Sequence, residues 1–451
     1  MLGELRMHEL AGYKGRVLDL IKTAGANIGD IVKLTRDGKS VEGLLMPRTV
    51  GRNENHVVLK LGTGYNVGVR VDESTRIEVV GTGARPALSK PPRPASKGLP
   101  KVTIFSTGGT IASRVDYRTG AVEPALTAED LYSFVPELAS EADVETKVLC
   151  NLFSENFTAR NWKEIAEAVR DEIRSGVSGV VVAQGTDTLG YSASALSFAL
   201  PSTPIPVVLV GAQRSSDRPS SDAATNLIGA VSVAARAPFA GVFVVMHEWM
   251  SDDTLLVHKG TKVRKCHTSR RDAFKSISAT PMARFHIETR KLEMLEAHYS
   301  ARGSSEIVCK PNFDDRAALV KFYPGLDPGV IDWYVAKGYR GLILEGTGLG
   351  HVSAACFPSL ARAVERGLFV GMTSQCLWGR VDMNVYSTGI DLQKIGVHPM
   401  EDMLPETALI KLMWVLGQTE DTARIAEMMR TNLAGEIGPR RPEGGEDGEA
   451  H

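Results

Sequence analysis

Short, mainly apolar runs that alternate with helical patterns constrain the fold of this chain more than any other feature of its sequence. Four such runs lie at residues 102–105, 180–183, 207–210 and 242–246. They lack the polar alternation of a strand with one face in water, so they suit a parallel sheet that helices cover on both faces. The sequence therefore predicts an α/β fold.

The segment between the first two runs has the pattern of an amphipathic helix. Asn161 stands where an N-cap is expected, and Glu164 follows it three residues later, as in a capping box. Apolar residues then recur at helical spacing as far as Ile173. Gly176 is expected to end this helix.

The alternation continues towards the C-terminus. Residues 191–200, which precede Pro201, and about 222–236 predict two more helices. A second, smaller α/β unit is expected from near residue 317. Its predicted strands are 319–322, 341–344 and 369–373, and its predicted helices are 330–337, 359–366 and 404–416.

Residues 85–100, RPALSKPPRPASKGLP, mark the clearest domain boundary, because prolines do not fit a sheet ladder or a helix interior. The preceding residues predict a small, SH3-like β-barrel. Its expected strands are 30–34, 41–46, 56–61, 67–71 and 76–80. Residues 438–451 are too polar to offset their ordering entropy, and we expect a disordered tail.

Composition excludes several classes of protein. Lys and Arg number 52 against 53 Asp and Glu, so global charge names no partner, and a basic patch for RNA contact would have to be local. No apolar run reaches about 18 residues and no signal peptide is apparent, so we expect a cytoplasmic protein without membrane contact. The five cysteines form no CxxC pair, which favours free thiols and no metal site.

Two glycine turns rich in hydroxyl residues directly follow predicted strands. The first is STGGTIA, residues 106–112, and the second is QGTDT, residues 184–188. Ligands of open α/β sheets bind at the carboxyl ends of strands, where glycines let backbone N–H groups approach a ligand. A structural turn and a phosphate-binding loop remain alternatives for the first motif, and a helix N-cap for the second.

A threonine hydroxyl becomes a good nucleophile only when a base takes its proton. Asp187 beside Thr186 could orient such a base, and a lysine with a lowered pKa could act as one. Three lysines follow the fourth predicted strand, namely Lys262, Lys265 and Lys275. The residues alone do not choose among them, since a loop lysine is ordinarily solvated.

The two threonine turns in this order resemble the bacterial-type L-asparaginase and glutaminase family. The similarity continues through residues 211–214, 222–227 and 274–276, and covers most of residues 101–418. It implies an asparaginase-like body of two domains with parallel sheets, which hydrolyses a side-chain amide without a metal or cofactor. Gln184 and Leu189 depart from the family pattern, which has His and Met there.

The resemblance also implies the roles of individual residues. Thr110 falls on the nucleophile, and the proton-transfer set falls on Thr186, Asp187 and Lys265. The substrate-binding positions are Ser154, Glu155 and Tyr117, and the backbone N–H groups of Gly109 and Gly185 would stabilise the oxyanion.

The N-terminal extension, with residues 375–389 and 403–417, resembles the D subunits of archaeal glutamyl-tRNA(Gln) amidotransferases. This narrower resemblance implies a homodimer that forms a heterotetramer with the E subunit of that enzyme. The E subunit would use ATP and Mg²⁺ to convert Glu-tRNA(Gln) to Gln-tRNA(Gln) with the released ammonia, and tRNA(Gln) would be bound through the complex.

The expected domains are a barrel at 1–84, a linker at 85–100, a first asparaginase-like domain at 101–300, a linker at 301–316, a second domain at 317–437 and the tail. Two other functions remain open. One is a free-standing cytoplasmic L-asparaginase, and the other is a non-catalytic RNA-binding or assembly protein.

Overall fold

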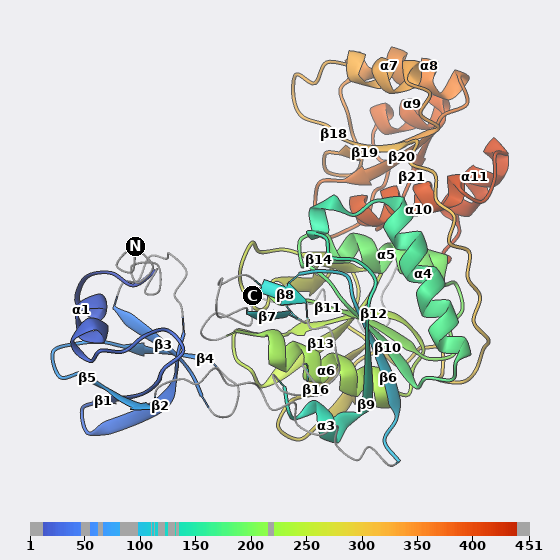
Figure 1. The fold of residues 1–451 in the computed structure, drawn as a ribbon. Coiled ribbons are helices and arrows are strands. Elements are labelled where there is room, and N and C mark those ends of the chain that lie inside the picture. The colour runs from blue at the N-terminus through green and yellow to red at the C-terminus, as the bar shows by residue number, and fades with distance from the viewer. Residues whose placement is uncertain are drawn as a thin grey trace.

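The computed structural model describes residues 12–46, 55–61, 66–81, 98–109, 111, 113–115, 122–124, 131, 135–214 and 221–439. Figure 1 shows two α/β units and a small N-terminal sheet with its own helix. Among the described residues, no helix is both long enough and apolar enough to span a membrane.

The first α/β unit is built on an eight-stranded sheet with the order β17-β16-β13-β12-β11-β10-β6-β9. All four predicted apolar runs are strands of this sheet. Its strands are β6 (Lys101–Ser106), β9 (Asp143–Val148), β10 (Gly179–Ala183), β11 (Pro206–Val210), β12 (Gly241–His247), β13 (Thr254–Lys259), β16 (Ala283–His286) and β17 (Lys291–Met294). A separate two-stranded sheet pairs β7 (Ser113–Val115) with β8 (Val122–Pro124).

Helices bury both faces of the parallel part of this sheet. On one face, α3 (Leu138–Glu141) and α6 (Ala223–Arg236) pack in a core that includes Val181. On the other, α4 (Ala159–Arg174) and α5 (Leu189–Ala199) pack in a core that includes Val180 and Val182. Successive strand residues thus enter opposite cores, which is why the runs lack polar alternation.

The four predicted apolar runs are parallel as expected, but the sheet also has an antiparallel edge that the sequence interpretation did not predict. Strands β9, β6, β10, β11 and β12 are parallel, whereas β13, β16 and β17 pair antiparallel. Only residues 248–253 join β12 to β13. A parallel pair needs a crossover of about a dozen residues or more, so such a short connection produces a hairpin.

The second α/β unit has a parallel four-stranded sheet in sequence order. Its core on one side lies under α7, α8 and α9. On the other side, α10 packs on α5 of the first unit, so one apolar core joins the two units. The elements are β18 (Ala317–Lys321), α7 (Gly329–Ala336), β19 (Gly341–Gly346), η2 (Ala354–Cys356), α8 (Phe357–Glu365), β20 (Phe369–Ser374), α9 (Ser387–Ile395), β21 (Val397–Pro399), α10 (Pro405–Leu416) and α11 (Thr422–Arg430).

The N-terminal strands form one antiparallel sheet with the order β4-β3-β2-β1-β5. No pairing joins β4 to β5 within the described part of the chain, so the closed barrel is not confirmed. The sequence interpretation also missed a helix, α1, whose Val17 and Ile21 are spaced four apart and enter the core of this sheet. The elements are α1 (Gly15–Thr23), β1 (Ile31–Arg36), β2 (Lys39–Leu45), β3 (His56–Lys60), β4 (Asn66–Arg70) and β5 (Arg76–Gly81).

The predicted start of α4 is wrong by one turn. Thr158 is the N-cap and Asn161 is the third helical residue, whose side-chain oxygen accepts the Thr158 backbone N–H at 2.9 Å. The amide of Asn161 therefore takes the part in the capping box that the sequence assigned to Glu164. Glu164 instead pairs with Arg160 on the helix surface at 2.8 Å.

Candidate active site

Two glycine turns meet at the carboxyl edge of the eight-stranded sheet. Strands β6 and β10 are parallel neighbours, and the turns that follow them approach so closely that a β-carbon on Gly109 would lie 2.7 Å from the Gly185 nitrogen. Gly109 also has a φ of 77°, which favours glycine. The structure thus brings together the backbone positions predicted to form the oxyanion site.

Lys265 joins the second turn from a distant segment of the chain. It ends β14 (Val263–Lys265), which pairs with β15 (Phe274–Ser276) in a hairpin. Its Nζ donates to Thr186 Oγ1 at 2.8 Å and to Asp187 Oδ1 at 2.7 Å. Three of the four predicted catalytic side chains therefore form one hydrogen-bonded group.

The exposure of this group argues against a purely structural role. Thr186 is buried and Lys265 is largely buried, whereas the Asp187 side chain is 71% exposed. An ion pair with one partner so open to water contributes only about 0–1 kcal/mol to stability. The arrangement instead places a lysine nitrogen where, once uncharged, it could take the proton of a threonine hydroxyl.

Two further segments border this group. Ser154, in η1 (Ser154–Asn156), is buried. It lies next to Gly185, where a β-carbon would be 3.2 Å from Ser154 Oγ. Thr188 Oγ1 fixes the segment by donating to the Ser154 carbonyl at 2.6 Å. Gly211, after β11, lies against Thr186, whose Cγ2 would be 2.6 Å from a β-carbon at that position.

The remaining predicted residues have different outcomes. Glu155 is exposed next to Ser154. Thr110, the predicted nucleophile, and Tyr117, the predicted activating residue, lie outside the described residues. Within the part of the chain that is described, no three His, Cys, Asp or Glu side chains are grouped so as to hold a metal ion.

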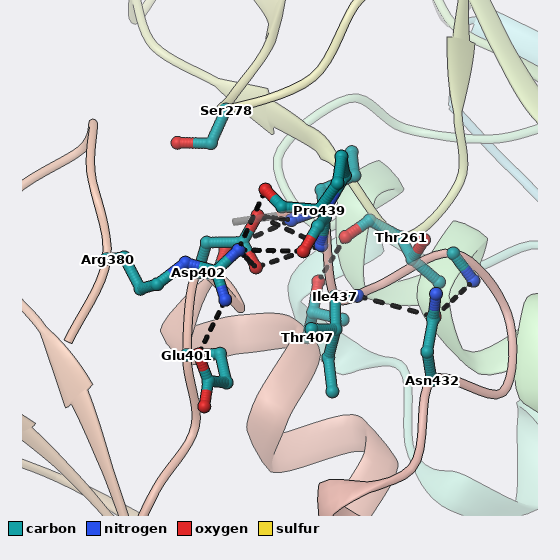
Figure 2. A network of polar contacts seen from close by, with 12 residues as sticks. Thr261, Ser278, Arg380, Glu401, Asp402, Thr407, Asn432, Ile437 and Pro439 are labelled. Carbon is teal, nitrogen blue, oxygen red and sulfur yellow. Dashed lines mark hydrogen bonds and ion pairs between the residues drawn. The ribbon is translucent and has the colours of Figure 1, made fainter. Parts of the chain in front are cut away.

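A polar network spanning both α/β units holds the turn that leads to Lys265. Lys262, 1% exposed, pairs with Asp402 of the second unit at 2.6 Å. Asp402 also accepts the Gly438 backbone N–H at 3.0 Å, and Arg380 donates to the Gly438 and Pro439 carbonyls at 2.7 and 3.1 Å (Figure 2). The first two residues of the predicted tail thus have defined contacts, and its other residues lie outside the described part.

Sequence reasoning missed these supporting residues. Figure 2 shows Thr261 and Asp402 gathered with Asn432, Ile437 and Pro439, although these segments are far apart in the sequence. Thr261 Oγ1 donates to the Ala434 carbonyl at 3.0 Å. No local pattern identifies such partners, because the pairing depends on how the two units pack.

Three family models match the chain. They are "Asparaginase, N-terminal" at residues 101–298, "Glutaminase/Asparaginase C-terminal domain" at 316–429 and "GatD N-terminal domain" at 26–80.

Curated relatives match over nearly the whole length. The D subunit of the glutamyl-tRNA(Gln) amidotransferase of Methanopyrus kandleri is 49% identical, over 97% of this chain and 98% of the relative. The protein of the same name from Pyrococcus abyssi is 51% identical, over 94% of this chain and 98% of its own.

Solved structures of L-asparaginases match about three quarters of the chain. The thermostable L-asparaginase from Thermococcus kodakarensis is 34% identical with a TM-score of 0.66, and the match covers 75% of this chain and 99% of that one. L-asparaginase I from Vibrio cholerae is 27% identical with a TM-score of 0.66, and covers 76% of this chain and 100% of that one.

Proposed function

The chain belongs to the family of glutamyl-tRNA(Gln) amidotransferase D subunits, and on that premise we propose that it supplies ammonia for a tRNA-dependent amidotransferase. It hydrolyses the side-chain amide of glutamine or asparagine. The ammonia passes to a partner protein, the E subunit, which converts Glu-tRNA(Gln) to Gln-tRNA(Gln).

The observation that carries this proposal is the contact of Lys265 Nζ with both Thr186 Oγ1 and Asp187 Oδ1, next to the paired glycine turns. Threonine as nucleophile forms an ester by attacking the amide carbonyl. The carbon–nitrogen bond breaks, a proton passes to the leaving nitrogen, and water then hydrolyses the ester. Backbone N–H groups at Gly109 and Gly185 stabilise the oxyanion of both steps.

We assign the attack on the amide to Thr110 and proton transfer to Thr186, Asp187 and Lys265. Intact-mass detection of an acyl adduct tests this assignment in Thr110→Val and Thr186→Val variants. The adduct is expected to be lost in Thr110→Val, and an adduct retained there would contradict the role of Thr110. Ser154, Glu155 and Tyr117 bind the substrate in this proposal.

The assembly is also part of the proposal. Two copies of this chain combine with two copies of the E subunit in a heterotetramer in the cytoplasm, and tRNA(Gln) binds through that complex. ATP and Mg²⁺ act in the E subunit, and this chain needs no cofactor. The domain boundaries at residues 84, 100, 300 and 316 and an N-terminal barrel belong to the same proposal.

A free-standing L-asparaginase is the second candidate function. This candidate is favoured by the match to the Thermococcus kodakarensis asparaginase. Three quarters of the present chain align with 99% of that enzyme. In that case, the chain would release ammonia at full rate without the E subunit or tRNA.

Replacement of Lys265 tests the proposed chemistry. Lys265→Met is expected to lower kcat for glutamine hydrolysis about 10²–10⁴-fold, because the proton relay is lost. Lys163→Met is the matched control, since Lys163 is exposed on α4, where its Nζ donates to Asn312 Oδ1 at 3.4 Å. Equal rates for the two variants, measured as ammonia release in the complex, would rule out Lys265 as a catalytic residue.

A further inference from the structure

A buried histidine lies at the end of β12. His247 is 0% exposed. Its Nδ1 lies 2.6 Å from Asn226 Oδ1 and its Nε2 lies 2.9 Å from Asp252 Oδ1. A ring nitrogen must carry a proton if its partner can only accept a hydrogen bond. The hydrogen-bonding capacity of Asn226 and Asp252 therefore determines the protonation of His247.

Asn226 can only accept a hydrogen bond from the imidazole. Its Nδ2 donates to the Gly211 carbonyl and to Asp222 Oδ2, each at 3.0 Å. Asp222 in turn accepts the backbone N–H groups of Gln213 and Arg214, at 3.0 and 2.8 Å, so it acts as an acceptor throughout. Reversing the Asn226 amide would place its oxygen against two acceptors, and Nδ1 of His247 must therefore carry a proton.

Asp252 can only accept as well. The hydrogen bond from His247 is the main cause that lowers the pKa of Asp252, and the charge of Arg271 adds to it. Arg271 also donates to the same Asp252 Oδ1 at 3.0 Å. An ionised carboxylate has no proton to donate, so Nε2 of His247 must also carry one.

We propose that His247 is a buried imidazolium that acts as a positioning residue for residues 211–214, of which Gly211 borders Thr186. The positive charge lies between Asp252 and the Asn226 oxygen. Asn226 and Asp222 then fix the backbone at Gly211, Gln213 and Arg214. Because Thr186 Cγ2 packs against Gly211, a fixed backbone at Gly211 also fixes the position of Thr186.

A second buried histidine of the same sheet provides a contrast within the molecule. His258, on β13, is 0% exposed, and among the described residues its Nδ1 hydrogen-bonds a hydroxyl, Ser276 Oγ, at 2.8 Å. No carboxylate in the described part of the chain offsets its burial, and burial with Lys275 nearby lowers the pKa of His258 to about 3. His258 is therefore neutral near neutral pH, whereas His247 is charged.

Nitrogen NMR of the full chain with ¹⁵N-labelled histidine, near neutral pH, tests the charge. His247 is expected to show two protonated ring nitrogens, whereas His258 is expected to show one protonated and one unprotonated ring nitrogen. His258→Leu identifies the His258 signals by removing them. Asp252→Asn identifies the His247 signals, because one of the two ring nitrogens of His247 then becomes unprotonated. An unprotonated ring nitrogen on His247 in the unsubstituted chain would overturn the proposal.

Kinetics test the positioning role, which rests on the proposed function of Thr186. In the complex with the E subunit, His247→Leu is expected to lower kcat for glutamine about 10–100-fold, because small displacements of reacting groups have effects of that order. His258→Leu removes an equally buried ring and is expected to leave kcat within about twofold. Asp252→Asn is the milder variant if His247→Leu does not fold, with a smaller loss in the same direction.

Unchanged kcat in His247→Leu, or equal losses in both leucine variants, would overturn the positioning role. An unsubstituted chain with no amidase activity would instead refute the proposed function. The NMR result would stand in that case, so the two failures are distinguishable.

Discussion

At the scale of single residues, burial of ionisable groups sets the response of this chain to pH. The folded chain holds His258 with a pKa of about 3, against about 6.5 for an unfolded histidine. Between those values the unfolded chain binds a proton that the folded chain does not. The contribution of His258 to stability is thus fully present above about pH 6.5 and is lost as pH falls through this window.

His258→Leu is expected to make the free energy of unfolding less dependent on pH. The difference in slope between the two proteins is at most about 1.4 kcal/mol per pH unit. Urea unfolding of both proteins at about pH 7 and about pH 5 measures this difference. Equal slopes would show that His258 is not held neutral in the folded chain.

The three candidate lysines show how far sequence alone determines the site. Lys265 contacts Thr186 and Asp187, Lys262 is buried against Asp402, and Lys275 lies beside Asp272 at 3.5 Å and over the Trp249 ring. All three follow β12 within a few dozen residues, and no local pattern separates them. The site is assembled from strand ends and a hairpin that are far apart in the sequence, so local patterns could not identify its lysine. Only the resemblance to the asparaginase family indicated Lys265.

At the scale of elements, periodicity identified most helices and strands to within about two residues, while caps and edges were less predictable. The helix predicted at 404–416 is α10 (Pro405–Leu416), and the strand predicted at 207–210 is β11 (Pro206–Val210). The antiparallel edge strands were missed because β16 and β17 are short and partly exposed, so they carry no continuous apolar run.

The start of α4 gives a prediction at this scale. Asn161→Ala removes the oxygen that accepts the Thr158 N–H, and should lower the free energy of unfolding by about 1 kcal/mol. Glu164→Ala removes only a surface pair with Arg160 and should change it by less than about 0.5 kcal/mol. A larger loss in Glu164→Ala than in Asn161→Ala, in urea unfolding, would reverse the assignment of the cap.

At the scale of the whole molecule, the two α/β units are joined by apolar packing and by buried charge. Phe198 of α5 stacks on Trp414 of α10 with ring centroids 6.0 Å apart. Lys262 and Asp402 form the buried ion pair, and burial lowers the pKa of Lys262 even though Asp402 opposes that shift. This pair links the second unit to the turn that precedes β14 and Lys265.

A double-mutant cycle tests that link. Lys262→Met and Asp402→Asn should each lower the free energy of unfolding by up to about 3–5 kcal/mol, since each removes one partner of a buried ion pair. The remaining contacts, Arg380 to Asp402 at 3.6 Å and Lys262 to the Asp402 carbonyl at 3.1 Å, reduce each loss. The double variant should lose clearly less than the sum of the two. Additive losses in thermal or urea unfolding would show that the two side chains are not coupled.

Ammonia release from glutamine and asparagine tests the central claim most directly. It is measured with the purified chain alone, and again with the E subunit, ATP, Mg²⁺ and Glu-tRNA(Gln). We expect slow release by the chain alone, faster release with the partner and tRNA, and formation of Gln-tRNA(Gln). Fast release that does not respond to either addition would favour a free-standing asparaginase, and no release under any condition would contradict the amidase function.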